Sequence, residues 1–87
     1  MAMSYKIVWK RRARRQLDNI QTQDATRILK KVRGLADREA WKNVKALKNH
    51  AYQYRLRVGN YRVLFDIRDG VEILDVEEVC RRNEQTY

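Results

Sequence analysis

Arginines in the second half of the sequence have the chemistry and the spacing to bind a phosphate group. Arg55 and Arg57 alternate with apolar residues before the dipeptide Gly59-Asn60, and Arg62 follows it. A glycine-first, two-residue turn of type II′ joins antiparallel strands and would place Arg57 directly opposite Arg62. Because directly paired residues share a face of the sheet, these three side chains gather on one surface. Guanidinium groups bind phosphate bidentately, so the pattern predicts a phosphate site.

A second turn signal extends this surface to a third strand. If the chain turns at Asp69-Gly70, Arg62 lies opposite Glu77, and the odd-numbered residues of the last strand lie on the same side of the sheet as the arginines. Arg81 continues that parity if the strand stays regular. The predicted site therefore gathers four arginines on one exposed surface: Arg55, Arg57, Arg62 and Arg81.

The predicted pairing of Arg57 with Arg62 brings two like charges together. Like charges that face each other across strands are destabilising. A cluster that repels itself indicates a missing anion, and phosphate is the natural ligand. The alternative interpretation is that acidic neighbours neutralise the arginines in ordinary surface ion pairs. Four carboxylates are available for that role: Asp66, Asp75, Glu77 and Glu78.

A basic run near the N-terminus is a second candidate for contact with a polyanion. It comprises Lys10, Arg11, Arg12, Arg14 and Arg15. Such a run is able to follow a nucleic-acid backbone through phosphate contacts. It is equally compatible with the solvated face of the first helix.

Other reactive side chains give weaker signals. His50 is the only histidine, and no serine, cysteine or second-histidine motif accompanies it, so we interpret it as a loop residue. Tyr52 and Cys80 are interpreted as packing residues. One cysteine and one histidine cannot build a metal cluster, and Mg²⁺ needs a carboxylate-rich pocket, which basic surroundings disfavour. No metal or other cofactor is expected.

The composition indicates a small basic domain with a polyanionic partner. The 87 residues correspond to one domain, residues 1–87. There are 20 Lys and Arg against 11 Asp and Glu; the resulting net charge of +9 favours nucleic acid first and an acidic protein second. We find no signal segment and no membrane-spanning stretch, and a single cysteine fits a reducing compartment. We therefore expect a cytoplasmic protein that does not enter a membrane.

The hydrophobic periods predict the elements that position these residues. Residues 5–9 alternate as a strand, and residues 10–19 and about 23–36 have the three- and four-residue apolar spacing of amphipathic helices. Residues 37–50 are less regular. From residue 52 onward the period is two, and the turn signals separate three strands. This order predicts an α+β fold with two N-terminal helices packed on one face of a four-stranded antiparallel sheet.

The second half of the chain resembles the RelE/ParE superfamily of bacterial toxins, and RelE most closely. The resemblance is carried by Leu47-Lys48, by the hairpin from Tyr52 to Phe65, and by Cys80-Arg81-Arg82 through Tyr87. The family shows a leucine with a basic residue, a basic strand, a glycine-containing turn followed by Tyr-Arg, and a basic pair before a tyrosine. The element order also matches over essentially the whole chain. The resemblance implies a microbial-ribonuclease-like fold.

The same resemblance implies a metal-independent toxin that cleaves mRNA in the ribosomal A site. In the family, a ribose 2′-OH attacks the adjacent phosphate. Carried over by position, Arg62 binds the scissile phosphate, Arg81 stabilises charge and assists the leaving oxygen, and Tyr87 is the base. Arg55 stands where the family often has lysine, and Gln53 replaces a catalytic lysine of some relatives. The expected contacts to RNA and the ribosome are Lys48, Arg57, Arg82 and the basic run, Lys10, Arg11, Arg12, Arg14 and Arg15.

The implied partners are the ribosome, mRNA and a cognate acidic antitoxin like RelB, which wraps the toxin in a hetero-oligomeric complex. Two other functions stay open. A ParE-type toxin shares the fold but poisons DNA gyrase and cleaves no RNA. A catalytically inactive basic module would only bind RNA or the ribosome. The tail from Arg81 to Tyr87 favours the RelE type, and Gln53 keeps the inactive module in consideration.

Overall fold

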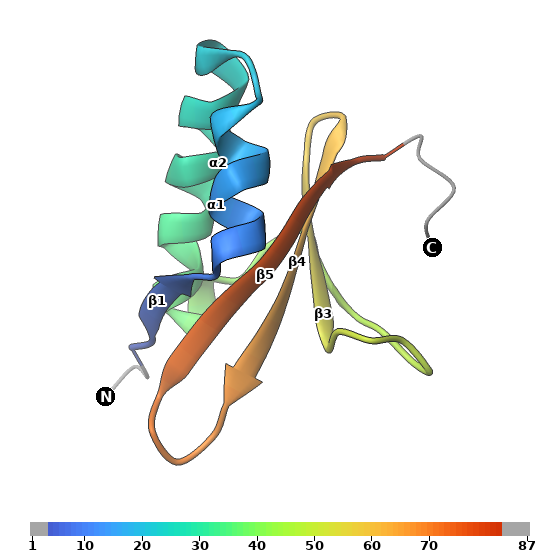
Figure 1. The fold of residues 1–87 in the computed structure, drawn as a ribbon. Coiled ribbons are helices and arrows are strands. Elements are labelled where there is room, and N and C mark those ends of the chain that lie inside the picture. Colours follow the sequence, from blue (N-terminus) through green and yellow to red (C-terminus); the bar gives the residue numbers. More distant parts are fainter. Residues whose placement is uncertain (1–3, 83–87) are drawn as a thin grey trace.

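The computed structural model describes residues 4–82 and shows two helices packed on one face of a twisted sheet (Figure 1). The helices are α1 (Arg11–Asp18) and α2 (Thr22–Arg33), and two short 3-10 turns follow at Gly34–Ala36 and Arg38–Ala40. The strands are β1 (Lys6–Trp9), β2 (Val44–Ala46), β3 (Tyr54–Val58), β4 (Tyr61–Arg68) and β5 (Ile73–Arg81). The predicted α+β class with two N-terminal helices on one face of the sheet is confirmed.

The sheet differs from the prediction in strand number and direction. Its five strands lie in the order β1-β5-β4-β3-β2, and β1 runs parallel to β5 whereas the other pairs are antiparallel. The prediction of four antiparallel strands is therefore wrong. Strand β2 has three residues, too few to produce a period-two pattern. The direction of β1 is that of its pairing with β5, a contact between distant parts of the sequence that no local pattern encodes.

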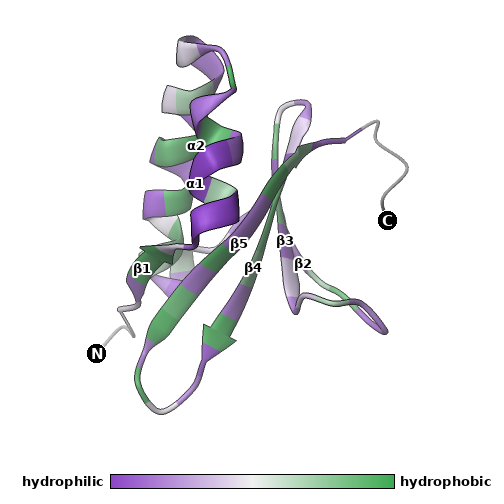
Figure 2. Cartoon of the chain, in the orientation of Figure 1, coloured by the Kyte–Doolittle hydropathy of each residue, from purple (hydrophilic) through white to green (hydrophobic). Residues whose placement is uncertain are grey.

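The hydrophobic core lies between the helices and one face of the sheet. Ile28 and Val32 of α2 are buried with Val63 and Phe65 of β4 and with Val76 of β5. Figure 2 shows bands of apolar and polar residues that follow one another along β5. Each such side chain contributes about 1.5–3 kcal/mol by leaving water. This burial fixes which face of each strand is turned to the helices, and it leaves the opposite face available for charged residues.

The first hairpin has the predicted turn and register. Gly59 has a φ of 53°, whereas Asn60 is not among the described residues with positive φ, in agreement with a type II′ turn. Arg57 pairs directly with Arg62, and Val58 with Tyr61. The face assignments that depend on this turn are therefore confirmed.

The second hairpin differs from the prediction. Arg68 pairs with Ile73, so the loop has four residues (69–72) in place of a two-residue turn at Asp69-Gly70. Farther along, Phe65 pairs with Val76 but Leu64 pairs with Glu78, which leaves Glu77 as the extra residue of a β-bulge. A bulge shifts the facing of every later residue by one position. Val79 consequently enters the core, contrary to its predicted place beside the arginines.

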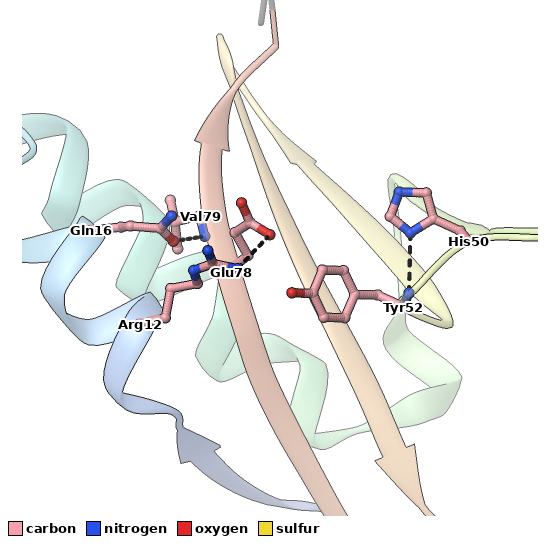
Figure 3. A network of polar contacts seen from close by, with 6 residues as sticks. All are labelled: Arg12, Gln16, His50, Tyr52, Glu78 and Val79. Carbon is pink, nitrogen blue, oxygen red and sulfur yellow. Dashed lines mark hydrogen bonds and ion pairs between the residues drawn. The ribbon is translucent and has the colours of Figure 1, made fainter. Parts of the chain in front are cut away.

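Helix α1 covers the outer edge of β5 beyond the end of β1. The last residue of β1 pairs with Val76, and the backbone N–H of Lys10 donates to the Val76 carbonyl at 3.0 Å. Beyond this point the side chain of Gln16 replaces β1 as the hydrogen-bond partner of β5: its Oε1 accepts a hydrogen bond of 2.7 Å from the Val79 N–H (Figure 3). The edge amide is thus blocked by a side chain instead of a strand. Neither helix of residues 4–82 has the length and hydropathy that a membrane crossing requires.

Candidate functional site

The sheet surface that faces away from the helices carries a row of basic side chains. Arg57 of β3 and Arg62 of β4 are directly paired, and Arg55 lies two residues before Arg57 on the same side of β3. The pairing of β2 with β3 adds Lys45, which lies opposite Arg55. We call these four residues the arginine face: Lys45, Arg55, Arg57 and Arg62. The three arginines lie on one face, as predicted. Lys45 was not predicted to join them, because it reaches this face through strand β2, which the sequence analysis did not identify.

Two grooves adjoin at Arg62. One has a volume of about 480 Å³ and is lined by Asn60, Arg62, Arg81 and Arg82. The other has a volume of about 320 Å³ and is lined by Lys45, Leu47, His50, Arg55, Arg57, Arg62 and Leu64. We call them the end groove and the face groove. No acidic side chain lines either one among the described residues, so together they form a continuous cationic surface around Arg62.

The cations of this surface repel one another. Burial lowers the pKa of Arg55 from its ordinary value, and three neighbouring charges lower it further: Arg57, Arg62 and Arg82. The Nε atom of Arg62 is buried and has no hydrogen-bond partner within residues 4–82. A buried N–H without a partner costs about 1–3 kcal/mol, so the geometry favours a ligand that accepts this hydrogen bond.

Neutralisation by acidic neighbours, the alternative interpretation, is not what the described residues show. The two ion pairs within residues 4–82 are Arg68–Asp75, at 2.9 Å, and Arg12–Glu78, at 3.8 Å. Neither includes a member of the arginine face. The carboxylate of Asp66 accepts from the backbone N–H of Gln53, at 2.7 Å. An anion from outside the chain is therefore the better match for this cluster.

Arg81 lies on the opposite face of the sheet from the one predicted. The bulge at Glu77 places Arg81 opposite Tyr61 and Cys80 opposite Arg62, so the prediction that Arg81 shares the arginine face is wrong. The guanidinium of Arg81 lies 5.7 Å from the centroid of the Tyr61 ring. Because it stands at the end of β5, it still lines the end groove with Arg62. The structure thus brings the two arginines together, but from opposite faces of the sheet.

The remaining predicted residues of this region are Arg82, Lys48 and Tyr87. Arg82 lines the end groove, where its guanidinium donates to the Gly59 carbonyl at 3.2 Å and its backbone N–H to the Asn60 carbonyl at 2.7 Å. Lys48 is exposed in the loop after β2 and lines neither groove. Tyr87 lies outside the described residues.

The N-terminal basic run does not join the arginine face. Arg11, Arg14 and Arg15 line a separate groove of about 490 Å³ on the outer side of α1. Arg12 instead pairs with Glu78. Lys10 is exposed, and its charge opposes the rise that burial and Asp66 produce in the pKa of Glu77. The run therefore splits into an outer basic patch and two residues that contact the acidic edge of β5.

Two residues near the face groove were assigned no function by sequence reasoning. His50 lines the groove, and its Nδ1 accepts a hydrogen bond of 3.1 Å from the Tyr52 N–H. Tyr52 lies outside the hydrophobic core, beside the Arg12–Glu78 pair (Figure 3). Neither position belongs to a strand, so no periodic pattern could have placed these two side chains. Within residues 4–82, no group of three or more His, Cys, Asp or Glu side chains could hold a metal ion.

The fold is shared with toxins of known structure. A chain of the toxin–antitoxin complex RelBE2 from Mycobacterium tuberculosis matches with a TM-score of 0.78 and 25% identity over 91% of this chain and 99% of that chain. The free E. coli toxin RelE, with two arginines replaced by alanine, matches with a TM-score of 0.76 and 17% identity over 93% and 86%. A chain of the archaeal RelE–RelB complex from Pyrococcus horikoshii matches with a TM-score of 0.71 and 19% identity over 94% and 99%.

The sequence of the chain matches the model of a protein family. No curated protein matches its sequence. The family model described as the ParE toxin of the type II toxin–antitoxin system parDE matches residues 7–86, nearly the full length. Sequence and fold agree, and the chain belongs to the ParE toxin family, within the RelE/ParE superfamily, as a toxin of a type II toxin–antitoxin system.

Proposed function

We propose that this toxin is a metal-independent endoribonuclease that cleaves mRNA in the ribosomal A site and so inhibits translation. The observation that carries the proposal is the cationic surface around Arg62, where two grooves meet and a buried Nε has no partner within residues 4–82. A phosphodiester supplies both the negative charge and the hydrogen-bond acceptor that this surface lacks.

The proposed reaction is an internal displacement at phosphorus. The ribose 2′-oxygen forms a bond to the adjacent phosphorus, and the bond from phosphorus to the 5′-oxygen breaks, which leaves a 2′,3′-cyclic phosphate and a 5′-hydroxyl. The 2′-OH gives its proton to a base, and the leaving oxygen takes one up. The extra charge of the phosphorane is stabilised by fixed positive groups, which often contribute the largest part of catalysis. Because guanidinium groups supply that charge here, the reaction needs no metal ion.

Three of the proposed catalytic roles fall to arginines that line the grooves. Arg62 binds the scissile phosphate, Arg81 in the end groove stabilises charge and assists the leaving oxygen, and Arg55 reinforces the field from the face groove. The predicted base is Tyr87. Replacement of Arg81 by Ala should lower single-turnover cleavage about 10²-fold, the scale for one preorganised charge stabiliser. Near wild-type cleavage by a folded Arg81→Ala variant would remove Arg81 from the mechanism.

The decisive experiment uses purified toxin and ribosomes programmed with a defined mRNA. Primer extension should reveal cuts at the A-site codon, with a 2′,3′-cyclic phosphate on the upstream fragment. Brief chelation of free metal, with ribosomes held intact at a separately controlled Mg²⁺ concentration, should leave the cleavage rate unchanged. Loss of cleavage under that control would contradict the metal-independent step.

Inhibition of DNA gyrase is the second candidate function, because the family model that matches the chain is that of the ParE toxin. The same purified toxin, incubated with gyrase and supercoiled DNA, would then trap cleaved DNA while leaving programmed mRNA intact. A toxin that binds ribosomes but gives neither product would instead be a catalytically inactive binding module. The three outcomes are mutually distinguishable.

The proposed partners are the ribosome, mRNA and an acidic RelB-like antitoxin, in the cytoplasm. Two structural relatives were crystallised in RelBE2 and RelE–RelB complexes. An acidic antitoxin segment would cover part of the arginine face and relieve its repulsion, forming a hetero-oligomer. Association should slow markedly as salt rises, since the encounter is electrostatic. An association rate insensitive to salt, measured by stopped flow, would argue against this encounter.

A further inference from the structure

The side chain of Arg27, an exposed residue of α2, reaches the turn of the β3–β4 hairpin. A Cβ atom at position 59 would lie 3.3 Å from Nη1 of Arg27, closer than an ordinary van der Waals contact. Gly59 therefore serves this turn in two ways: it adopts a positive φ, and it leaves the space that the guanidinium occupies. A helix residue thus places its charge against the turn that separates Arg57 from Arg62.

The helix that carries Arg27 is anchored to the hairpin one turn earlier. The hydroxyl of Tyr61, a buried residue of β4, donates to Oδ2 of Asp24 at 3.1 Å. Asp24 and Arg27 are three residues apart in α2, so their side chains lie on the same face of the helix. The bond to Tyr61 therefore holds Arg27 at the turn and engages the carboxylate nearest to it in the sequence. Neither ion pair formed by residues 4–82 includes Arg27.

Arg82 approaches the same turn from the end of β5. Its guanidinium donates to the Gly59 carbonyl at 3.2 Å, and its backbone N–H donates to the Asn60 carbonyl at 2.7 Å. Figure 1 shows the end of β5 beside the tip of the β3–β4 hairpin. A guanidinium carries five N–H donors, so the bond to Gly59 leaves further donors for a ligand. Two guanidinium groups from distant parts of the sequence thus meet at one glycine.

The end groove beside this turn has room for more than the scissile phosphate. Its volume of about 480 Å³ lies within the range of about 300–1,000 Å³ that holds a drug-sized ligand. Arg62 and Arg81 line it, together with Arg82 and with Asn60 of the turn. Arg82 is therefore placed to engage a second anionic group while Arg62 holds the first.

We propose that Arg27 and Arg82 bind a second phosphodiester of the mRNA, next to the scissile phosphate. This inference rests on the proposed nuclease function. Guanidinium groups bind phosphate oxygens through charge-assisted hydrogen bonds, and a single RNA strand presents such groups one nucleotide after another. The geometry at Gly59 brings both guanidinium groups to the end of the groove where the strand would continue past Arg62. Arg27 is thus an RNA-binding residue contributed by the helical layer.

The contact is tested first by the salt dependence of binding. Toxin is titrated onto ribosomes programmed with mRNA whose A-site nucleotides are 2′-deoxy and so cannot be cleaved, at several potassium chloride concentrations and fixed Mg²⁺. Each phosphate neutralised on a single strand contributes about 0.7 to the slope of log affinity against log salt. Arg27→Gln should therefore lower the slope by about 0.7 and weaken binding about 2- to 5-fold, the range for an exposed ion pair.

Two further variants serve as controls. Arg27→Lys keeps the charge and should restore the wild-type slope. Arg33→Gln removes an exposed charge six residues farther along α2 and should leave the slope unchanged. Thermal unfolding establishes that all three variants fold. An unchanged slope in Arg27→Gln, or a slope lowered equally by Arg33→Gln, would overturn the proposal.

Uncharged linkages then identify the phosphate. The titration is repeated with mRNAs that carry one methylphosphonate at each position flanking the cleavage site in turn. The methylphosphonate that replaces the contacted phosphate should abolish the difference in affinity between the wild type and Arg27→Gln, whereas those at other positions should preserve it. A difference that persists with every one of these mRNAs would overturn the proposal, because Arg27 would then contact ribosomal RNA.

The binding measurement separates this proposal from the nuclease proposal. Wild-type toxin that binds the 2′-deoxy mRNA but leaves natural mRNA uncut would contradict the nuclease function, while the comparison with Arg27→Gln would still test the phosphate contact. Conversely, A-site cleavage by a wild type whose salt slope equals that of Arg27→Gln would overturn the second phosphate site alone.

Discussion

Replacing Arg62 with methionine should change stability and activity in opposite directions. Methionine keeps an unbranched side chain but removes the charge and the hydrogen-bond donors. The buried Nε without a partner costs about 1–3 kcal/mol, and a directly opposed like charge such as Arg57 costs about 0.2–1 kcal/mol. Since the side chain of Arg62 is only half-buried, we take the lower part of this range.

The expected gain is therefore about 1 kcal/mol in the free energy of unfolding, or about 4–8 °C in Tm for a domain of this size. Single-turnover cleavage of mRNA should fall about 10²-fold or more, because a preorganised charge stabiliser is lost. The two quantities are measured by thermal unfolding and by cleavage at saturating toxin. The stability gain should shrink as salt screens the repulsion.

Arg33→Met provides the matched control. Arg33 is exposed at the end of α2 and lines neither groove, so its loss should change stability by no more than about 0.5 kcal/mol and leave cleavage intact. If Arg62→Met were less stable than the wild type, or cleaved at the wild-type rate, the assignment of Arg62 as an anion site kept at a cost in stability would be wrong.

Three further substitutions test other parts of the structure. Arg14→Ala, in the outer basic patch, should weaken ribosome binding and spare the saturated cleavage rate, measured by titrating ribosomes in single-turnover assays. Gln16→Leu should lower the free energy of unfolding by about 1–3 kcal/mol and speed hydrogen exchange at Val79, since it leaves that edge N–H without its acceptor. Glu77→Gln should be more stable than the wild type in thermal melts at neutral pH. Burial and Asp66 raise the pKa of Glu77 in the folded state. The stability of the wild type therefore falls as pH rises from the unfolded-state pKa of Glu77 through its folded-state pKa. The difference should vanish in acid, where Glu77 is protonated in both states; a difference that persists there would exclude ionisation as its cause.

The sequence predicts the arginine face well because a single local signal determines it. Gly59-Asn60 specifies the turn, the turn specifies the register, and the register places Arg55, Arg57 and Arg62 on one side. Each step depends only on neighbouring residues. The same argument fails for Arg81, because it assumes a regular strand, whereas two consecutive glutamates place the core residues Val76 and Val79 three positions apart instead of two.

The parts of the site that lie outside the strands could not be predicted by periodicity. Lys45 joins the arginine face only because a three-residue strand pairs with β3. His50 was interpreted as a loop residue, since its place in the groove depends on a hydrogen bond from the backbone of Tyr52. Tyr52 fits the alternation of the core residues of β3, but it precedes the strand. Its side chain therefore lies outside the core, beside the Arg12–Glu78 pair.

The bulge at Glu77 also determines which changes in chain length the toxin can tolerate. Loop 69–72 joins the strands at the end of the hairpin opposite to Arg81, so a residue gained or lost there changes no side chain's facing. Deleting Glu77 would restore a regular alternation, so that Val76 and Val79 still face the core and Arg81 still pairs with Tyr61, whereas deleting Cys80 would turn Arg81 away from Tyr61. Tolerance to insertion and deletion in this toxin is thus governed by parity rather than by distance from the grooves: the loop is free to vary in length and the extra residue at Glu77 can be lost, while the number of residues from Glu78 to Arg81 is fixed.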